Sequence, residues 1–214
     1  MTAYLRSLGL EPVMVQEFEF NTLDVTPQLM SLRGAGAEAL IFFGSLGNDA
    51  AKVLENMLDL GWDVPVLGSL VMTNYAKGSA GIIGAEAFEN VYSGNFITMS
   101  WCEGDAVGTS EFAQFVAGAY ARVPDLDRLG GPAALPPYYI QPTIVAAAIN
   151  GAGTSDGAPV AEWIETNSDQ ITALIGTLSA APDNHFLPAP DAIVTVRNPH
   201  LIREDGLLER ADCP

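Results

Sequence analysis

The chain has 214 residues, and 49% of them are apolar, which is enough for a substantial hydrophobic core and argues against wholesale disorder. Its 26 acidic side chains outnumber nine lysines and arginines, so the formal net charge is −17. Nucleic acids and anionic membrane surfaces are bound largely through cationic side chains, and this charge therefore argues against both partners. The sequence has no run of about 18 apolar residues, the length that crosses a bilayer, so we expect no direct membrane insertion.

The first ten residues and the two cysteines bear on export. The N-terminus lacks a basic start followed by an apolar stretch, so we expect no signal peptide in this chain; the pattern is typical of the last turns of a helix that ends at Gly9. Cys102 and Cys213 are too few for a metal site, and neither adjoins a histidine. They form a disulfide if the protein is exported, or remain two free thiols. We expect no cofactor.

Residues 11–20 predict a strand, because apolar side chains alternate towards their end. A helix follows, with Thr26 as its expected cap and Pro27 as its first residue, and it ends at Gly34 and Gly36. The pattern therefore predicts a strand and then a helix after the short N-terminal helix that ends at Gly9.

Residues 39–43 form a continuous apolar run, which predicts a strand buried on both faces. Residues 64–67 predict a second strand, and an amphipathic helix that ends at Gly61 joins the two. Such a pair makes a right-handed βαβ unit of an α/β fold with a parallel sheet. Ligands in open parallel sheets sit beyond the carboxyl ends of the strands, which here means residues 44–48 and 69–73.

The rest of the chain adds a loop, helices and two strands. Gly78, Gly81 and Gly84 predict an irregular segment with a short helix near residues 74–77. The further expected elements are a strand at 88–98, a polar crossing at 101–108, a helix from Ser110, a long loop at 124–137, helices at 138–152 and 159–166, a weak helix or strand at 171–178, and a strand at 191–197.

Several short motifs follow one another along this framework. They are Asp24-x-Thr26-Pro27-Gln28-Leu29, Gly34-Ala35-Gly36-Ala37-Glu38-Ala39-Leu40, Gly44 to Asp49, Leu60-Gly61-Trp62-Asp63-Val64-Pro65-Val66-Leu67-Gly68, Tyr138-Tyr139 at the start of an Ala-rich helix, and Ala148-Ile149-x-x-Ala152-Gly153. In this order and at these spacings, the chain resembles the substrate-binding proteins of branched-chain amino acid ABC transporters, which have the class I periplasmic binding protein fold.

The resemblance implies a bilobal α/β fold, incomplete at the N-terminus, because complete members begin with an export signal, most of a first lobe and the opening strand of the second. Residues 1–99 would form most of the second lobe and residues 100–187 the returning part of the first. Residues 188–214 would cross back and form a tail on the second lobe. This return gives Cys102 and Cys213 a shared neighbourhood and makes them disulfide candidates.

The resemblance also implies a function. Such proteins clamp a small solute between two lobes that close on a hinge, and they present it to the membrane subunits of an ABC permease. We therefore expect a solute-binding protein without catalysis, periplasmic or at the cell surface in its full-length form. Ligand contacts come from the loops after the strands of the second lobe, which here hold Ser45, Leu46 and Gly47 in one loop and Ser69, Leu70 and Val71 in the other.

Two departures from the family pattern bear on the ligand. Amino-acid binders carry an acidic side chain in the second loop, whereas residues 69–73 contain no carboxylate, and Leu46 replaces the usual aromatic of the first loop. These departures favour an amino acid relative, an amide, or a small organic or aromatic acid over an α-amino acid. Ser45 and Ser69 are also ordinary turn and capping residues, which every βα loop needs.

Other residues are weaker candidates. Trp101, Asp183 and His185 lie where the resemblance places hinge crossings, so they are hinge or cleft candidates, although a histidine there is more often structural or exposed. The missing strand would leave a sheet edge open, through which we expect self-association.

Two other functions fit the same elements. One is a ligand-sensing domain of the same fold, and the other is a small α/β enzyme. The enzyme needs an acid, base or nucleophile in the loops after the strands, where only Asn48 and Asp49 are polar enough, and helix capping explains those two better.

Overall fold

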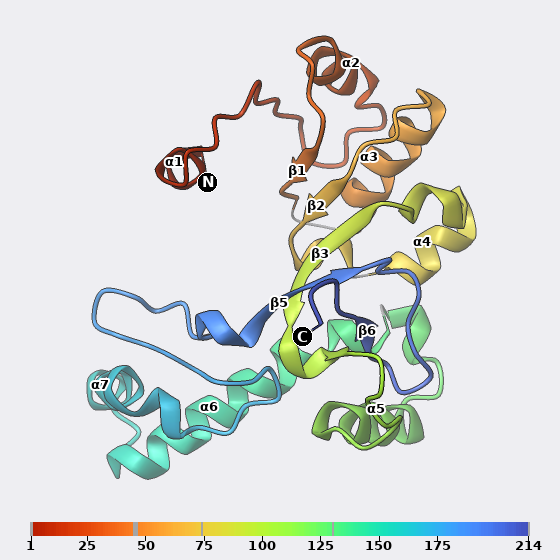
Figure 1. Cartoon of the computed structure of the whole chain (residues 1–214). Coiled ribbons are helices and arrows are strands. Elements are labelled where there is room, and N and C mark those ends of the chain that lie inside the picture. The colour runs from red at the N-terminus through yellow and green to blue at the C-terminus, as the bar shows by residue number, and fades with distance from the viewer. Residues whose placement is uncertain (1, 45–46, 74, 130, 214) are drawn as a thin grey trace.

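A computed structural model describes the whole chain except residues 1, 45–46, 74, 130 and 214 (Figure 1). Its longer elements are α1 Thr2–Ser7, α2 Thr26–Gly34, β1 Leu40–Phe42, α3 Gly47–Asp59, β2 Val66–Gly68, α4 Ala76–Ile83, β3 Val91–Phe96, β4 Ser100–Trp101, α5 Glu111–Arg122, α6 Pro136–Ala152, α7 Gly157–Asn167, β5 Ile193–Arg197 and β6 Leu208–Glu209. Short 3₁₀ turns add η1 Leu70–Met72, η2 Ala85–Phe88, η3 Ile97–Met99, η4 Leu126–Leu129, η5 Pro132–Ala134, η6 Ser168–Gln170 and η7 Pro190–Ala192.

The sheet has four strands in the order β1-β2-β3-β5. Strands β1, β2 and β3 are parallel, as the βαβ pattern predicts, and β5 pairs antiparallel with β3. Helices α2, α3 and α4 lie against one face of this sheet (Figure 1). We call this body, residues 25–98 together with 193–197, the sheet unit. The α/β class and the parallel sheet expected from the sequence are confirmed.

The core of the sheet unit forms where α3 meets the strands. Val53, Leu54 and Met57 are spaced to fall on one side of α3, and they are buried in the same cluster as Val66 and Val91 of the sheet. Burial of these side chains fixes the helix on the sheet, because each buried aliphatic side chain contributes about 1.5–3 kcal/mol.

The opposite face of the sheet is uncovered, which corrects the expectation that residues 39–43 are buried on both faces. Ile41 is 40% exposed, Leu67 42% and Ile193 39%, although Phe42 on the helix side is buried. The physical reason is that α2, α3 and α4 all pack on one side, while α1 stands away from the sheet and contains no buried residue (Figure 1). Parallel sheets are normally covered on both faces.

Residues 11–20 do not form the expected strand. The segment is extended, yet none of its described residues belongs to a strand, and Val13 and Val15 are 60% and 62% exposed. Side-chain contacts hold its end at the sheet unit, because the Phe18 ring stacks on Phe42 at 6.3 Å. An alternating apolar pattern predicts a strand only where a partner strand lies within hydrogen-bonding distance.

Two further expectations need correction. Thr26 is the first residue of α2 rather than its cap, and Asp24 Oδ1 accepts a hydrogen bond from the Thr26 N–H at 2.9 Å. Helix α4 runs through Gly78 and Gly81, which were expected to be irregular, and stops at Gly84, whose φ is +100°. Residues 171–178 form neither a regular helix nor a strand, although Leu174, Ile175 and Leu178 are buried.

Helices α5, α6 and α7 form a second body, residues 110–178, which we call the helical unit. Ser110 caps α5, because its Oγ accepts the Ala113 N–H at 3.1 Å, as the sequence predicts. Gly151 lets α7 approach α6 closely, since a Cβ there would lie 2.2 Å from the Trp163 ring. The core of this unit contains Phe112, Ile140, Ile144 and Leu178 and is separate from that of the sheet unit.

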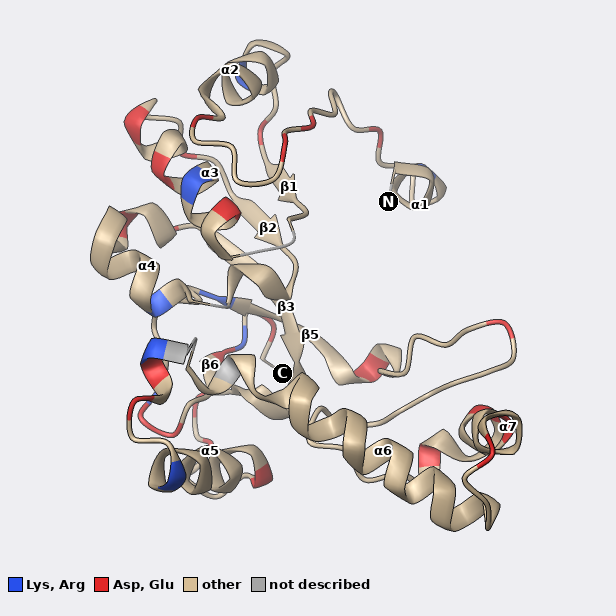
Figure 2. Ribbon diagram, turned by 180° about the vertical axis from the view of Figure 1, so that it is seen from behind, with Lys and Arg blue, Asp and Glu red and all other residues tan. Residues whose placement is uncertain are grey.

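Charged side chains lie outside the first two strands of the sheet. Figure 2 shows acidic residues on helices and connecting loops, whereas β1 and β2 carry no charged side chain. No helix in the described part of the chain is long and apolar enough to span a lipid bilayer.

The outer edge of β1 generates a prediction. No described residue pairs with that edge, and residues 39–44 carry no charge that would oppose pairing with another chain. We predict that the chain self-associates with rising concentration, measured as a mass above 22.6 kDa by light scattering. Ile41→Lys should reduce the association by placing a charge on β1, whereas Leu23→Lys, at an 86% exposed position outside the sheet, should not. A monomer at every concentration would contradict this.

Candidate functional site

Gly68 is the last residue of β2 and Gly44 lies two residues after β1, and both are closely surrounded. A Cβ at Gly44 would lie 2.4 Å from Cζ of Phe42, and a Cβ at Gly68 would lie 1.8 Å from Cγ of Met72. Large apolar side chains therefore fold over the strand ends at positions where only hydrogen fits. The carboxyl edge of the sheet therefore combines these close-packed glycines with exposed apolar side chains such as Phe43 and Leu70.

The structure places four of the six expected ligand residues at that edge. Gly47 is buried at the start of α3, while Ser69, Leu70 and Val71 follow β2 directly. Ser45 and Leu46 lie outside the described residues.

The loop after β2 is anchored by its own backbone. The Ser69 carbonyl oxygen accepts hydrogen bonds from Ser93 Oγ at 2.8 Å and from the Met72 N–H at 2.9 Å. Val71 packs against the core of the sheet unit, and Leu70 is 36% exposed. Of these three side chains, Leu70 and Ser69 are therefore the more available to a solute.

Ser69 also borders a hollow of about 350 Å³ on the uncovered face of the sheet. Apolar side chains of Ile41, Phe43 and Leu67 line most of it, and Asp212 of the C-terminal tail contributes a carboxylate. Sequence reasoning did not single out Asp212, because only the folded chain brings the tail back to β2.

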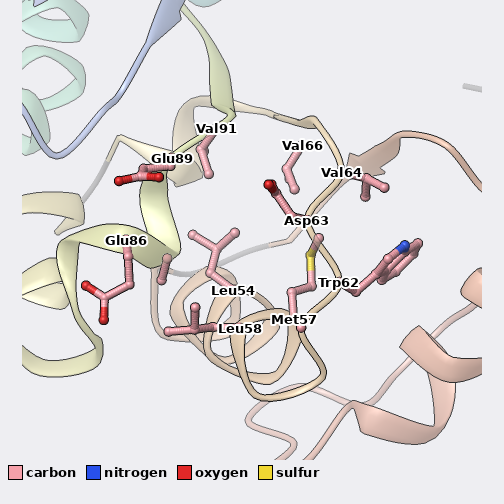
Figure 3. Close-up of a pocket in the computed structure, with 12 residues that line it drawn as sticks. Leu54, Met57, Leu58, Trp62, Asp63, Val64, Val66, Glu86, Glu89 and Val91 are labelled. Atoms are coloured by element: carbon pink, nitrogen blue, oxygen red, sulfur yellow. The ribbon is translucent and has the colours of Figure 1, made fainter.

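A second cavity, of about 200 Å³, lies at the amino ends of β2 and β3 (Figure 3). Leu54 and Met57 of α3 form its apolar wall, and Asp63, Glu86 and Glu89 add carboxylates. Asp63 already accepts a hydrogen bond from Asn90 Nδ2 at 2.9 Å. The cavity is at the opposite edge of the sheet from the loops after the strands, so it is separate from the candidate ligand edge.

Trp101 lies in the first crossing between the two units. Its indole ring packs against the core of the helical unit and is covered by the guanidinium of Arg203, 4.9 Å from the ring centroid. Strand β4, which contains Trp101, pairs in parallel with β6 of the C-terminal tail. The structure therefore places this hinge candidate inside the crossing.

Arg203 forms the best-buried ion pair of the crossing. Its Nη2 lies 2.7 Å from Asp205 Oδ2, and the two side chains are only 14% and 5% exposed. Burial raises the pKa of Asp205, but hydrogen bonds from Arg203 and from the Gly108 N–H outweigh that effect and hold the pKa below its usual range. Both members of the pair belong to the tail, and they reach the segment after Trp101 through separate hydrogen bonds: Asp205 accepts the Gly108 N–H at 2.9 Å, and Arg203 Nη1 donates to the Asp105 carbonyl oxygen at 3.1 Å.

Cys102 and Cys213 are joined by a disulfide in the structure. Their sulfurs are 2.10 Å apart and their Cα atoms 5.7 Å, across a sequence separation of 111 residues. The bond ties the first crossing to the end of the tail, alongside the β4–β6 strand pair and the hydrogen bonds of Arg203 and Asp205 with residues 105 and 108. Three interactions therefore hold the same two segments together.

Asp183 and His185, the other two hinge or cleft candidates, lie in the segment between α7 and β5. His185 lies in an outer loop beside the helical unit. Its Nε2 is 2.9 Å from Oε1 of Glu165 on α7, and its side chain is 69% exposed.

His200 packs against the Phe88 ring at 5.3 Å, and burial lowers its pKa although Glu89 acts in the opposite direction. Neither histidine adjoins the loops after β1 and β2. Among the described residues, no three potential metal ligands cluster.

Asn95, near the end of β3, was not recognised from the sequence. Val91, Ser93 and Asn95 alternate along the helix-covered face of β3, and all three are at most 1% exposed. Alternation predicts their burial, but only the folded structure shows which partners their polar atoms find.

Comparisons with known proteins identify the family to which the chain belongs. The sequence matches the family described as periplasmic binding protein over residues 1–200, so the chain belongs to that family. A search of curated proteins finds no match.

Solved structures show the same fold at low sequence identity. A type 1 periplasmic binding protein from Bordetella pertussis Tohama I superposes with a TM-score of 0.71 at 16% identity, covering 99% of this chain and 56% of that one. An extracellular ligand-binding receptor from Rhodopseudomonas palustris HaA2 gives 0.70 at 17% identity, with 98% and 57% covered. The leucine binding protein LivK from Thermotoga maritima gives 0.60 at 17%, with 98% and 53% covered. The chain thus spans little more than half the length of these relatives.

The disulfide generates a prediction about stability. Closing so long a loop stabilises the fold by about 4–5 kcal/mol in the chain-entropy model, so Cys102→Ser should lower the free energy of unfolding in urea by about that amount. Cys213→Ser and the double variant should lower it equally, because one bond is lost in each case. Dithiothreitol should destabilise only the unsubstituted chain, and an unchanged urea midpoint on reduction would contradict the prediction.

The Arg203–Asp205 pair generates a pH dependence. Because the folded state holds the pKa of Asp205 below its unfolded value near 3.8, the pair contributes stability above that pH and loses it as the pH falls through the folded value. Asp205→Asn should cost about 3 kcal/mol at pH 7 and flatten the acid limb of the unfolding curve. Asp212→Asn, a control at an exposed carboxylate, should change little. Equal acid limbs for Asp205→Asn and the unsubstituted chain would contradict this.

Proposed function

We propose that this chain is the ligand-capturing part of an extracytoplasmic solute-binding protein that serves an ABC importer. Its membership of the periplasmic binding protein family is the observation that carries the proposal. The sheet unit would act as most of the second lobe, within residues 1–99. The helical unit would act as the returning part of the first, within residues 100–187, and residues 188–214 would cross back between them.

The arrangement of the crossings supports a clamp. The chain passes between the units at η3 and β4, again after residue 178, and the tail returns to pair with β4. A few connecting segments of this kind are what hinge closure requires, because rotation at their termini moves two rigid bodies without disturbing either core. The disulfide between two of these segments is also consistent with an oxidising compartment.

The composition of the loops bears on the solute. Residues 44–48 and 69–73 contain no lysine, arginine or histidine, and the second loop contains no carboxylate. An ammonium group would find no opposite charge in the second loop. We therefore propose an amide, a small organic acid, an aromatic acid or another amino acid relative as the solute, held by hydroxyl, amide and backbone groups. Delivery to the membrane subunits of a permease follows from the proposed class of protein.

Thermal melting of the purified chain tests this proposal. The panel is leucine, isoleucine and valine, the matched compounds 3-methylbutanamide, 3-methylbutanoate and 3-methylbutylamine, and benzoate. A solute present at about 100 times its dissociation constant should add about 2.7 kcal/mol of stability and raise the melting temperature measurably. A cooperative melt that no member of the panel shifts would count against solute capture by this chain.

A further inference from the structure

We infer that the side-chain amide of Asn95 is the hydrogen-bond donor that the sheet unit offers to its solute, and that the solute carries a carbonyl or carboxylate oxygen to accept that bond. The inference rests on the proposed function of solute capture and assigns the polar recognition within it.

The position of Asn95 follows from the strand register. Gly68, the last residue of β2, pairs with Ser93 of β3, so Asn95 lies two residues beyond the end of β2 on the same face as Ser93. That level of the sheet is where η1 begins, and the Ser93 hydroxyl already bonds the Ser69 carbonyl there. Asn95 is thus at the carboxyl edge, beside the loop expected to contact a solute.

The orientation of the amide is fixed by one hydrogen bond. The backbone N–H of Phe96 donates to Asn95 Oδ1 at 2.8 Å, and an N–H donates only to the oxygen of a side-chain amide. This leaves Nδ2 as the free end. In the described part of the chain Nδ2 has no hydrogen-bond partner, although the residue is only 1% exposed.

A buried donor without a partner costs stability, and native structures contain few. An apolar side chain of similar size at this position would avoid the cost, as Val91 does lower on the same strand face. Such groups are retained where a ligand or a second conformation supplies the missing acceptor. The lack of cationic side chains in residues 44–48 and 69–73 leaves an amide as a suitable donor for a solute oxygen.

The first crossing gives the solute access to this donor. Asn95 is followed within two residues by η3, where the chain leaves the sheet unit. Rotation at this point changes what covers the end of β3, so the amide becomes available as the units open and is enclosed with the solute as they close.

Three compounds with one carbon skeleton test the inference. 3-Methylbutanamide and 3-methylbutanoate present an acceptor oxygen, and 3-methylbutylamine does not. We expect the first two, and not the amine, to raise the melting temperature of the unsubstituted chain. Equal binding of the amine would overturn the inference.

Substitutions then separate a binding role from a structural one. Asn95→Leu removes the unpaired Nδ2 donor but also the Oδ1 acceptor of the Phe96 N–H, so it should lower the melting temperature without solute slightly, and it should weaken amide binding by about tenfold or more. Asn95→Asp should abolish binding of the carboxylate by charge repulsion while keeping the amide, whose NH₂ can donate to the new carboxylate. Asn56→Leu is the matched control: this buried asparagine already bonds the Val25 N–H at 2.9 Å, so its loss should lower stability and leave affinity intact.

Two negative results have different meanings. If Asn95→Leu binds all solutes as tightly as the unsubstituted chain does, the role of Asn95 is wrong and solute capture stands. If the unsubstituted chain melts cooperatively and no compound shifts it, solute capture by this chain is wrong, and the assignment of Asn95 falls with it.

Discussion

The connection between the first crossing and the C-terminal tail is the constraint on which the rest of the structure depends. The two units have separate cores, although Phe96 at the end of β3 packs against the core of the helical unit. A disulfide, a short parallel strand pair and the hydrogen bonds of Arg203 and Asp205 with residues 105 and 108 all join these same two segments. In the proposed clamp, joining on this side would confine bending between the units to a few residues of the crossings.

The loops at the carboxyl edge of the sheet, residues 44–48 and 69–73, contain no charged side chain. The polar groups of residues 44–48 and 69–73 are backbone, hydroxyl and amide groups, and the 36% exposed side chain of Leu70 lies beside them. Neutral hydrogen-bonding groups discriminate between solutes by geometry rather than by charge. Each group stabilises the complex only where a solute atom replaces the hydrogen bond to water that it loses on binding. A chain with a net charge of −17 can therefore still recognise an anionic or neutral solute through local dipoles.

The uncovered sheet face has a different consequence. Apolar side chains at Ile41, Leu67 and Ile193 remain partly in water because every helix of the sheet unit packs on the other side. The acidic helices and loops around it keep the chain charged, and this opposes association in general. Strand β1, however, carries no charged side chain, and no described residue pairs with its outer edge, so no local charge opposes pairing of that edge with another chain.

The sequence by itself determined the class of fold and most of its elements. Apolar runs, glycine stops and caps such as Ser110 act over a few residues, so they predicted β1, β2, the helices between and around them, and the loops where a solute would bind. Their order also carried the family resemblance, since spacing along the chain is itself a sequence property.

Only the tertiary structure decided what depends on partners distant in sequence. Residues 11–20 have the pattern of a strand, but no described strand lies beside them. Residues 39–43 have the pattern of a strand buried on both faces, but one face remains exposed to solvent. Some residues of the candidate site could be predicted from the sequence and others could not. Ser69 and Leu70 were predictable because they follow a strand. Asn95, Arg203 and Asp205 were not, because hydrogen-bond satisfaction and ion pairing are properties of the neighbours that folding supplies. Short-range pattern fixes the elements, and long-range packing decides which of their surfaces and polar groups find partners.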